Sequence, residues 1–73
     1  MHFRMGDLVK HRDGEVGIII GINDGSLTVE ELKAKYRLEH VGTIGSIRVS
    51  FAPSDIDWIY PSWLEVISEV SSR

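Results

Sequence analysis

The chain contains no cysteine, and only two of its 73 residues are proline. Without cysteine, neither a disulfide framework nor a thiolate metal site can form. Small domains that lack these supports rely on a regular core or on a partner. Because a single core and its loops use up a chain of this length, we expect one domain that spans residues 1–73.

Long apolar runs and an excess of basic charge are also missing. The longest apolar run, IIIGI at residues 18–22, is too short to cross a membrane, and the start MHFRMGD has no secretory apolar region. Eight Lys and Arg stand against eleven Asp and Glu, which gives a net charge of −3 and disfavours phosphate-rich partners. We therefore expect a cytoplasmic protein without membrane contact, in the host cytoplasm or the virion if it is viral.

Short apolar segments separated by turn residues fill most of the chain. This pattern is typical of a small all-β barrel. The predicted strands are residues 6–11, 15–22, 47–51, 56–60 and 64–67. Asp13 and Gly14 supply a tight turn between the first two, because both residue types tolerate positive φ. Residues 23–45 then form an insertion between the second and third strands.

The second predicted strand, EVGIIIGI, is interrupted by two glycines. The alternation places Val16, Ile18, Ile20 and Ile22 on one face and Gly17, Ile19 and Gly21 on the other. Glycine weakens a strand interior, so its presence indicates a bend or a close approach of another backbone. A small barrel needs such bends to close.

The insertion contains a segment, about 26–43, that is predicted as a short helix or a hairpin. Thr28 followed by Glu31 is a capping box, which favours a helix from about Val29 to Tyr36. Apolar and charged residues nevertheless alternate along 31–39, which favours a strand. We expect the helix, because a capping box depends on two residues at a fixed spacing.

The segment DWIYPSWLEVI concentrates the aromatic residues. Pro61 donates no ladder hydrogen bond, so a 3-10 turn is predicted at residues 61–63, before the last strand and a flexible tail at 68–73. Trp58 and Ile59 lie on opposite faces of their strand, and only one of them can face the core. Because a tryptophan fills much of a small core, we expect Trp58 to be the buried one.

Two stretches resemble known small barrels. GDLVKHRDGEVGIIIGI is similar in layout to KOW-type barrels, and YPSWLEVI resembles the ending of Src-homology-3 domains. Five strands with a 3-10 turn before the last therefore resemble a Src-homology-3-like barrel, and the layout is also similar to small barrel proteins of bacteriophages. The resemblance implies that Pro61 and Trp63 help to floor a groove for proline-rich peptides, and that Leu64 is a core residue. The acidic loop of peptide-binding members is missing, so the partner is not predicted to be a proline-rich peptide.

Catalytic and metal-binding patterns are missing from the sequence. His2, His11 and His40 are far apart, and no cysteine or paired-histidine spacing accompanies them. Asp55 and Asp57 could hold a cation, but such alternating carboxylates usually form a solvated strand face. No nucleophile elbow or phosphate-binding loop is present. We expect a non-enzymatic protein without metal or cofactor.

The predicted function is that of a protein-interaction module, such as a small bacteriophage-type accessory protein. Its candidate partner-binding residues are Trp63, Pro61, Tyr60 and Tyr36, since exposed aromatic residues often dominate binding. One alternative is a nucleic-acid-binding KOW-like domain that uses Lys10, His11, Arg12, Lys33, Lys35, Arg37 and Arg48. Another is a structural or assembly component that associates with its own copies. If the insertion is a strand, its edge could pair with another chain and give such a homo-oligomer.

Overall fold

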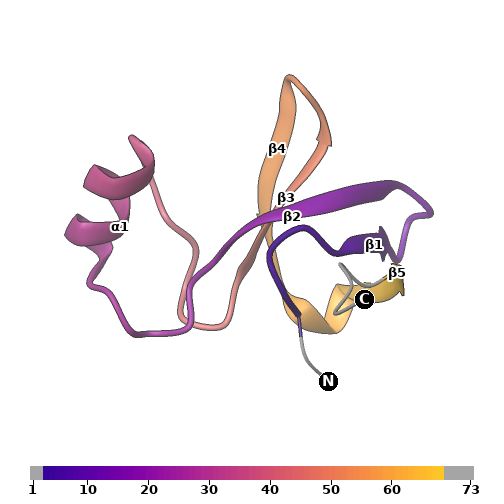
Figure 1. Ribbon diagram of the computed structural model, residues 1–73, viewed down its shortest axis with the longest axis horizontal. Helices are drawn as coiled ribbons and strands as arrows, with labels where there is room; N and C mark the ends of the chain where they lie inside the picture. The colour runs from indigo at the N-terminus through magenta and orange to yellow at the C-terminus, as the bar shows by residue number, and fades with distance from the viewer. Residues whose placement is uncertain (1–2, 69–73) are drawn as a thin grey trace.

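Five antiparallel strands form a single sheet in the computed structural model, which describes residues 3–68 (Figure 1). The elements are β1 (Leu8–His11), β2 (Val16–Ile22), α1 (Val29–Tyr36), β3 (Ile47–Ala52), β4 (Asp55–Ile59), the 3-10 turn η1 (Pro61–Trp63) and β5 (Leu64–Ser68). The protein is therefore mainly β with one short helix, and the 3-10 turn lies where the sequence predicts it. The predicted tail at residues 68–73 falls, after Ser68, outside the described residues.

The prediction of a closed barrel is wrong, because the sheet is open. Its strand order is β4-β3-β2-β1-β5, and within residues 3–68 the two outer strands do not pair with each other. The amide of Trp58 in β4 donates to the carboxylate of Asp57 at 2.9 Å, so it is not available to another strand. The chain then turns at Pro61, which has no amide hydrogen to extend the ladder. Both features lie near the end of β4, which is an edge strand of the sheet.

One cluster of aliphatic side chains forms the core, and every strand contributes to it. Its buried members are Val9, Ile19, Ile47, Val49, Ile59 and Leu64. Leu64 is thus a core residue, as the resemblance implied. Ile59 faces inward, so the prediction that Trp58 fills the core is wrong. Trp58 is instead half-buried on the opposite face of β4, paired with Arg48.

The face of β2 that packs inward carries Gly17 and Ile19, as one of the two predicted faces does. Gly17 and Ile19 are buried, whereas Val16 and Ile18 are 46% and 45% exposed. A Cβ atom at Gly17 would lie 2.6 Å from Val49 Cγ1 and 2.8 Å from the Ser50 carbonyl oxygen. The register between β2 and β3 also shifts between Ile19 and Gly21. After the register shift the predicted faces exchange, so that Ile22 packs against the core and Gly21 lies beside Arg48 on the outer face. Both the close approach and the bend predicted from the glycines are therefore present.

The helix α1 has the predicted bounds and the predicted cap. The Thr28 hydroxyl accepts a hydrogen bond from the Glu31 amide at 3.1 Å, and the Glu31 carboxylate accepts one from the Thr28 amide at 2.8 Å. That backbone hydrogen bond is the main reason why the pKa of Glu31 lies below its usual value. The helix ends at Tyr36, and its C-cap Arg37 adopts a left-handed φ of 56°. The capping box therefore prevails over the alternating pattern.

The helix lies at one end of the molecule, away from β5 and η1 (Figure 1). Leu32 is its buried residue, and it does not belong to the main core cluster. The insertion thus has a small apolar centre of its own. Neither α1 nor η1 has the length and apolar character that a membrane-crossing helix requires, within the part of the chain that the structure describes.

Replacement of Gly17 by alanine tests the close approach of β2 and β3. We expect Gly17→Ala to lower the free energy of unfolding by about 1–3 kcal/mol, because the new methyl group overlaps buried atoms of β3. Gly21→Ala is the matched control, since its Cβ would meet the side chain of Arg48 at 3.1 Å and should cost less. Urea denaturation measures both. A Gly17→Ala protein as stable as the wild type would contradict the described packing.

Candidate functional site

The aromatic side chains gather at the end of the core where η1 joins β5. Trp63 is half-buried and packs against the core cluster. The His11 ring meets Trp63 edge-on, with ring centroids 5.8 Å apart, and meets Phe51 edge-on at 6.0 Å. Such perpendicular contacts are a preferred geometry for aromatic rings. These three rings cover one end of the core and fix the orientation of Trp63.

Arg12 covers Trp63 from the solvent side. Its guanidinium carbon lies 3.7 Å from the centroid of the Trp63 ring, a cation–π contact, and its amide donates to the Trp63 carbonyl oxygen at 2.9 Å. The turn after β1 is thereby attached to η1 by both backbone and side chain. Trp63 thus has one side on the core and the other side under the Arg12 cation.

Tyr60 is the exposed member of the aromatic group. Its ring centroid lies 5.5 Å from that of Trp63, and 55% of its surface is exposed. Pro61 follows directly and is half-buried as the first residue of η1. Tyr60, Pro61 and Trp63 therefore form one continuous surface together with Arg12. We call these four residues the aromatic end surface.

The charge beside the aromatic end surface is mixed. His11 Nδ1 lies 2.9 Å from Oδ1 of Asp13 and 3.1 Å from the Asp13 amide nitrogen, so it accepts from the amide when neutral and donates to the carboxylate when protonated. The Glu15 amide donates to the same carboxylate at 2.9 Å and is the main reason that the pKa of Asp13 lies below its usual value. At neutral pH the surface therefore carries the Arg12 cation next to the Asp13 anion.

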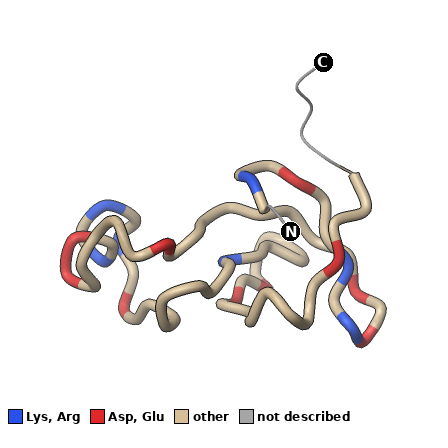
Figure 2. The backbone as a smooth tube through the Cα atoms, turned by 90° about the horizontal axis from the view of Figure 1, so that it is seen from below, with Lys and Arg blue, Asp and Glu red and all other residues tan. Residues whose placement is uncertain are grey.

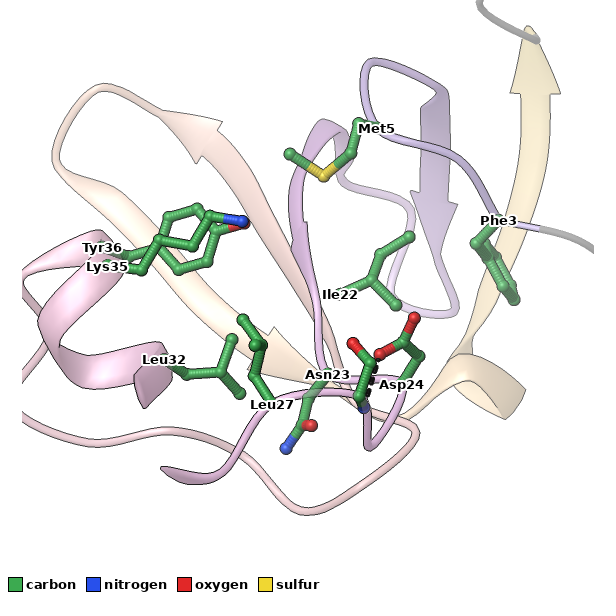
Figure 3. A pocket seen from close by; sticks show the side chains of 10 residues that line it. Phe3, Met5, Ile22, Asn23, Asp24, Leu27, Leu32, Lys35 and Tyr36 are labelled. Atoms are coloured by element: carbon green, nitrogen blue, oxygen red, sulfur yellow. Dashed lines mark hydrogen bonds between the residues drawn. The ribbon is translucent and has the colours of Figure 1, made fainter. Parts of the chain in front are cut away.

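Tyr36, the fourth predicted binding residue, lies elsewhere. It lines a cleft of about 370 Å³ between α1 and the sheet, where Leu27 and Leu32 on the helix side oppose Met5 and Ile22 (Figure 3). The ammonium group of Lys35 lies 5.4 Å from the centroid of the Tyr36 ring. The structure thus joins three of the four predicted residues and separates Tyr36 from them.

The basic residues predicted for the nucleic-acid alternative are dispersed (Figure 2). Lys10 and Arg12 belong to β1 and its turn, and Lys33 and Lys35 to α1. Arg37 and Arg48 do line a common hollow with Trp58, but Glu39 and Asp57 line it as well. The set therefore divides among three places with carboxylates between them. Among residues 3–68, no three histidine, aspartate or glutamate side chains converge as a metal site would require.

A second surface, not predicted from the sequence, lies on the outer face of the sheet. Directly paired residues form a row across four strands: Leu8, Ile18, Ser50 and Ile56. Ile56 is 40% exposed, similar to Ile18 and to Val16 beside it. The alternation in β2 indicated two apolar faces. Val16, Ile18 and Ile56 therefore leave apolar side chains exposed on the outer face, while Gly17 and Ile19 are buried on the inner face.

Comparisons of the chain with protein-family models, with curated proteins and with solved structures find no match. The function must therefore be argued from the surfaces themselves. Two of them have apolar or aromatic side chains exposed in a defined arrangement: the aromatic end surface and the row on the outer face. The first contains the residues that the sequence predicted, and the second is new.

Trp63 and Tyr60, the two rings of the aromatic end surface, should differ in how much they contribute to stability. We expect Trp63→Ala to lower the free energy of unfolding by about 2–3 kcal/mol, since it removes a half-buried ring that packs on the core and on His11. Tyr60→Ala should cost less than about 1 kcal/mol, because more than half of that side chain is in water. Thermal unfolding by circular dichroism compares them. Equal losses in the free energy of unfolding would show that the ring of Trp63 packs on the core no more extensively than that of Tyr60.

Proposed function

We propose that the protein is a non-enzymatic interaction module that binds a protein partner through the aromatic end surface. The observation that carries the proposal is the exposure of Tyr60. More than half of this large aromatic side chain is in water, yet it is held in edge contact with Trp63. Tyrosine, tryptophan and arginine are the residues that dominate binding energy at protein interfaces. All three types meet here around Pro61.

The supports of this surface are rigid, which favours binding. Pro61 fixes its own φ, and Trp63 is held by the core, by His11 and by Arg12. A partner that docks on such a surface immobilises few side chains, so it loses little conformational entropy. The adjacent Arg12 and Asp13 provide a polar rim of both signs. A partner segment with an apolar centre and flanking charges fits this arrangement.

The order of the strands and the 3-10 turn along the chain also supports the proposal. We infer a relationship in architecture to Src-homology-3-like proteins, because five antiparallel strands and a 3-10 turn before the last strand are shared with the layout that the sequence resembles. In that family the positions equivalent to Pro61 and Trp63 contribute to a binding groove. The open sheet and the helical insertion are departures, so the shared part is the end of the sheet where η1 lies.

Nucleic-acid binding remains the alternative proposal, and the hollow that Arg37 and Arg48 share with Trp58 is the feature that favours it. A tryptophan that is partly exposed, as Trp58 is, can stack on a base while arginines contact phosphates. Glu39 and Asp57 in the same hollow oppose phosphate binding, and so does the net charge of −3. We therefore favour the protein-binding proposal.

Capture experiments with two tyrosine variants test the proposed surface. A lysate of the cells in which the chain occurs is passed over the immobilised wild type, Tyr60→Ala and Tyr36→Ala. We expect Tyr60→Ala to weaken capture of a specific protein about tenfold or more, as loss of an interface anchor does. Tyr36→Ala is the matched control, because Tyr36 lies in the separate cleft, and it should capture the partner as the wild type does.

Two outcomes would count against this function. Unchanged capture by Tyr60→Ala would place the binding surface elsewhere on the molecule. A gel shift of single-stranded DNA or RNA at low salt, abolished by Arg37→Ala or Arg48→Ala, would establish the alternative, since phosphate contacts are strongest at low ionic strength.

A further inference from the structure

The hollow beside Trp58 brings an indole ring together with several cationic groups. It has a volume of about 200 Å³ and is lined by residues 37–40, which follow α1, and by residues of β3 and β4. Arg48 pairs directly with Trp58 across these two strands, and residues directly opposite in a sheet point to the same side. Arg37 and His40 line the hollow from the segment after α1. Two arginines and a histidine therefore surround one half-buried tryptophan.

The loop before β3 holds Trp58 in place. A Cβ atom at Gly42 would lie 2.9 Å from the Cβ atom of Trp58, so the absence of a side chain at residue 42 lets the loop approach the tryptophan closely. The side chain of Asn23, a residue that is 3% exposed, donates to the Gly42 carbonyl oxygen at 2.8 Å. The loop is thus tied to the end of β2, and it fixes Trp58 beside the hollow.

Arg37 occupies a backbone position at which glycine is usual. It is the C-cap of α1, and among residues 3–68 it is the one non-glycine residue with a positive φ, at 56°. Its amide donates to the Lys33 carbonyl oxygen and so closes the helix. A glycine would close the helix equally well, so the turn does not require the arginine side chain. The guanidinium group is the part of Arg37 that a ligand in the hollow can use.

We propose that the hollow binds a single free nucleotide whose base carries an exocyclic amino group. The base stacks on Trp58, as bases do on accessible aromatic rings. The phosphate is bound by Arg37 and Arg48, because the planar guanidinium group forms paired hydrogen bonds with phosphate oxygens. The hollow is smaller than the roughly 300–1,000 Å³ of pockets that enclose a drug-sized ligand. It therefore holds the base and leaves the sugar and the phosphate at its rim.

The distribution of charge favours a single nucleotide over a strand. A strand presents a row of phosphates and needs a track of basic residues, whereas the basic residues outside the hollow are dispersed (Figure 2). One phosphate group needs only the two arginines of the hollow. The net charge of −3 also repels a polyanion more strongly than it repels one nucleotide.

Glu39 is the reason for including the amino group in the proposal. A carboxylate that lines the hollow weakens binding of a purely anionic ligand, but it accepts a hydrogen bond from the exocyclic amine of a base. Asp57 is not suited to this role. It pairs with the buried Val49, so its side chain lies on the core side of β4, and its carboxylate accepts the Trp58 amide at 2.9 Å. Cytosine, which has the amine, therefore fits the hollow better than uracil, which lacks it.

Titration of the protein with CMP, UMP and cytidine, followed by NMR, tests the proposal. CMP and UMP differ in the group that Glu39 is proposed to contact, and cytidine lacks the phosphate. We expect CMP to shift the indole signal of Trp58 and the amide signals of residues 37–40, with a Kd of about 0.1–1 mM at low salt, since one base and one phosphate anchor it. UMP should bind about threefold more weakly than CMP, and cytidine about tenfold more weakly. The indole signal of Trp63 should not move.

Substitutions in the hollow assign the contacts. Arg37→Gly should weaken CMP binding about tenfold, while its midpoint of urea denaturation stays close to that of the wild type, because glycine suits the left-handed cap. Glu39→Gln should reduce the preference for CMP over UMP, since an amide donates as well as accepts hydrogen bonds. Arg4→Ala is the matched control: it removes an arginine that is exposed and does not line the hollow, so it should bind CMP as the wild type does.

Four results would overturn the proposed nucleotide site. The first is an indole signal of Trp58 that CMP does not move at concentrations far above the expected Kd. The second is inorganic phosphate that binds the hollow as tightly as CMP, since the base would then contribute nothing. The third is a folded Arg37→Gly protein that binds CMP as the wild type does. The fourth is a single-stranded oligonucleotide that binds the hollow much more tightly than CMP, since this would assign the hollow to the nucleic-acid alternative.

Discussion

The structure depends on the close contact of β2 with β3 at Gly17. Because no side chain separates the two strands there, Val49 and the Ser50 carbonyl lie where they would overlap, within van der Waals radii, the Cβ atom of any other residue. This contact directs Ile19 into the core and brings Val9, Ile47 and Ile59 around it. A chain of 73 residues has few large side chains to bury, so the position of each one matters.

Burial of the face of β2 that carries Gly17 leaves apolar side chains exposed on the other face of the sheet. Side chains alternate between the two faces of a strand, so burial of Gly17 and Ile19 exposes Val16 and Ile18. The cross-strand pairing then aligns Ile18 with Leu8 and, through Ser50, with Ile56. The apolar outer face thus follows directly from the packing of the core. The aromatic end surface follows from it too, since Trp63 closes the end of the same core and carries Tyr60 beside it.

Local signals in the sequence were sufficient for most of the secondary structure. Thr28 and Glu31 predicted α1 because a capping box is formed by neighbours in the chain, and Pro61 predicted η1 because its ring excludes it from the ladder. The aromatic end surface was predicted in part for a similar reason, as Tyr60, Pro61 and Trp63 are adjacent. Tyr36 was predicted beside them but lies in the separate cleft, because nothing local indicates where a helical insertion lies.

The features that the sequence did not reveal depend on pairing between distant strands. Whether Trp58 or Ile59 faces the core is decided by the register of β4 on β3, where Ile59 lies opposite Ile47. Closure of the barrel required β4 to meet β5, which lie at opposite edges of the sheet, and no local pattern in the sequence specifies whether such distant strands pair. The apolar row on the outer face could be recognised only after four strands had been aligned.

The most direct test of this account is a methyl NOE spectrum of the isoleucine, leucine and valine side chains, recorded on the dilute protein. A shift of one residue would turn every side chain of β2 to the other face, so the spectrum separates the two faces clearly. We expect cross-peaks between Ile19 and Val49 and between Ile18 and Leu8. Cross-peaks between Ile18 and Val49, with Ile19 close to Leu8 instead, would contradict it.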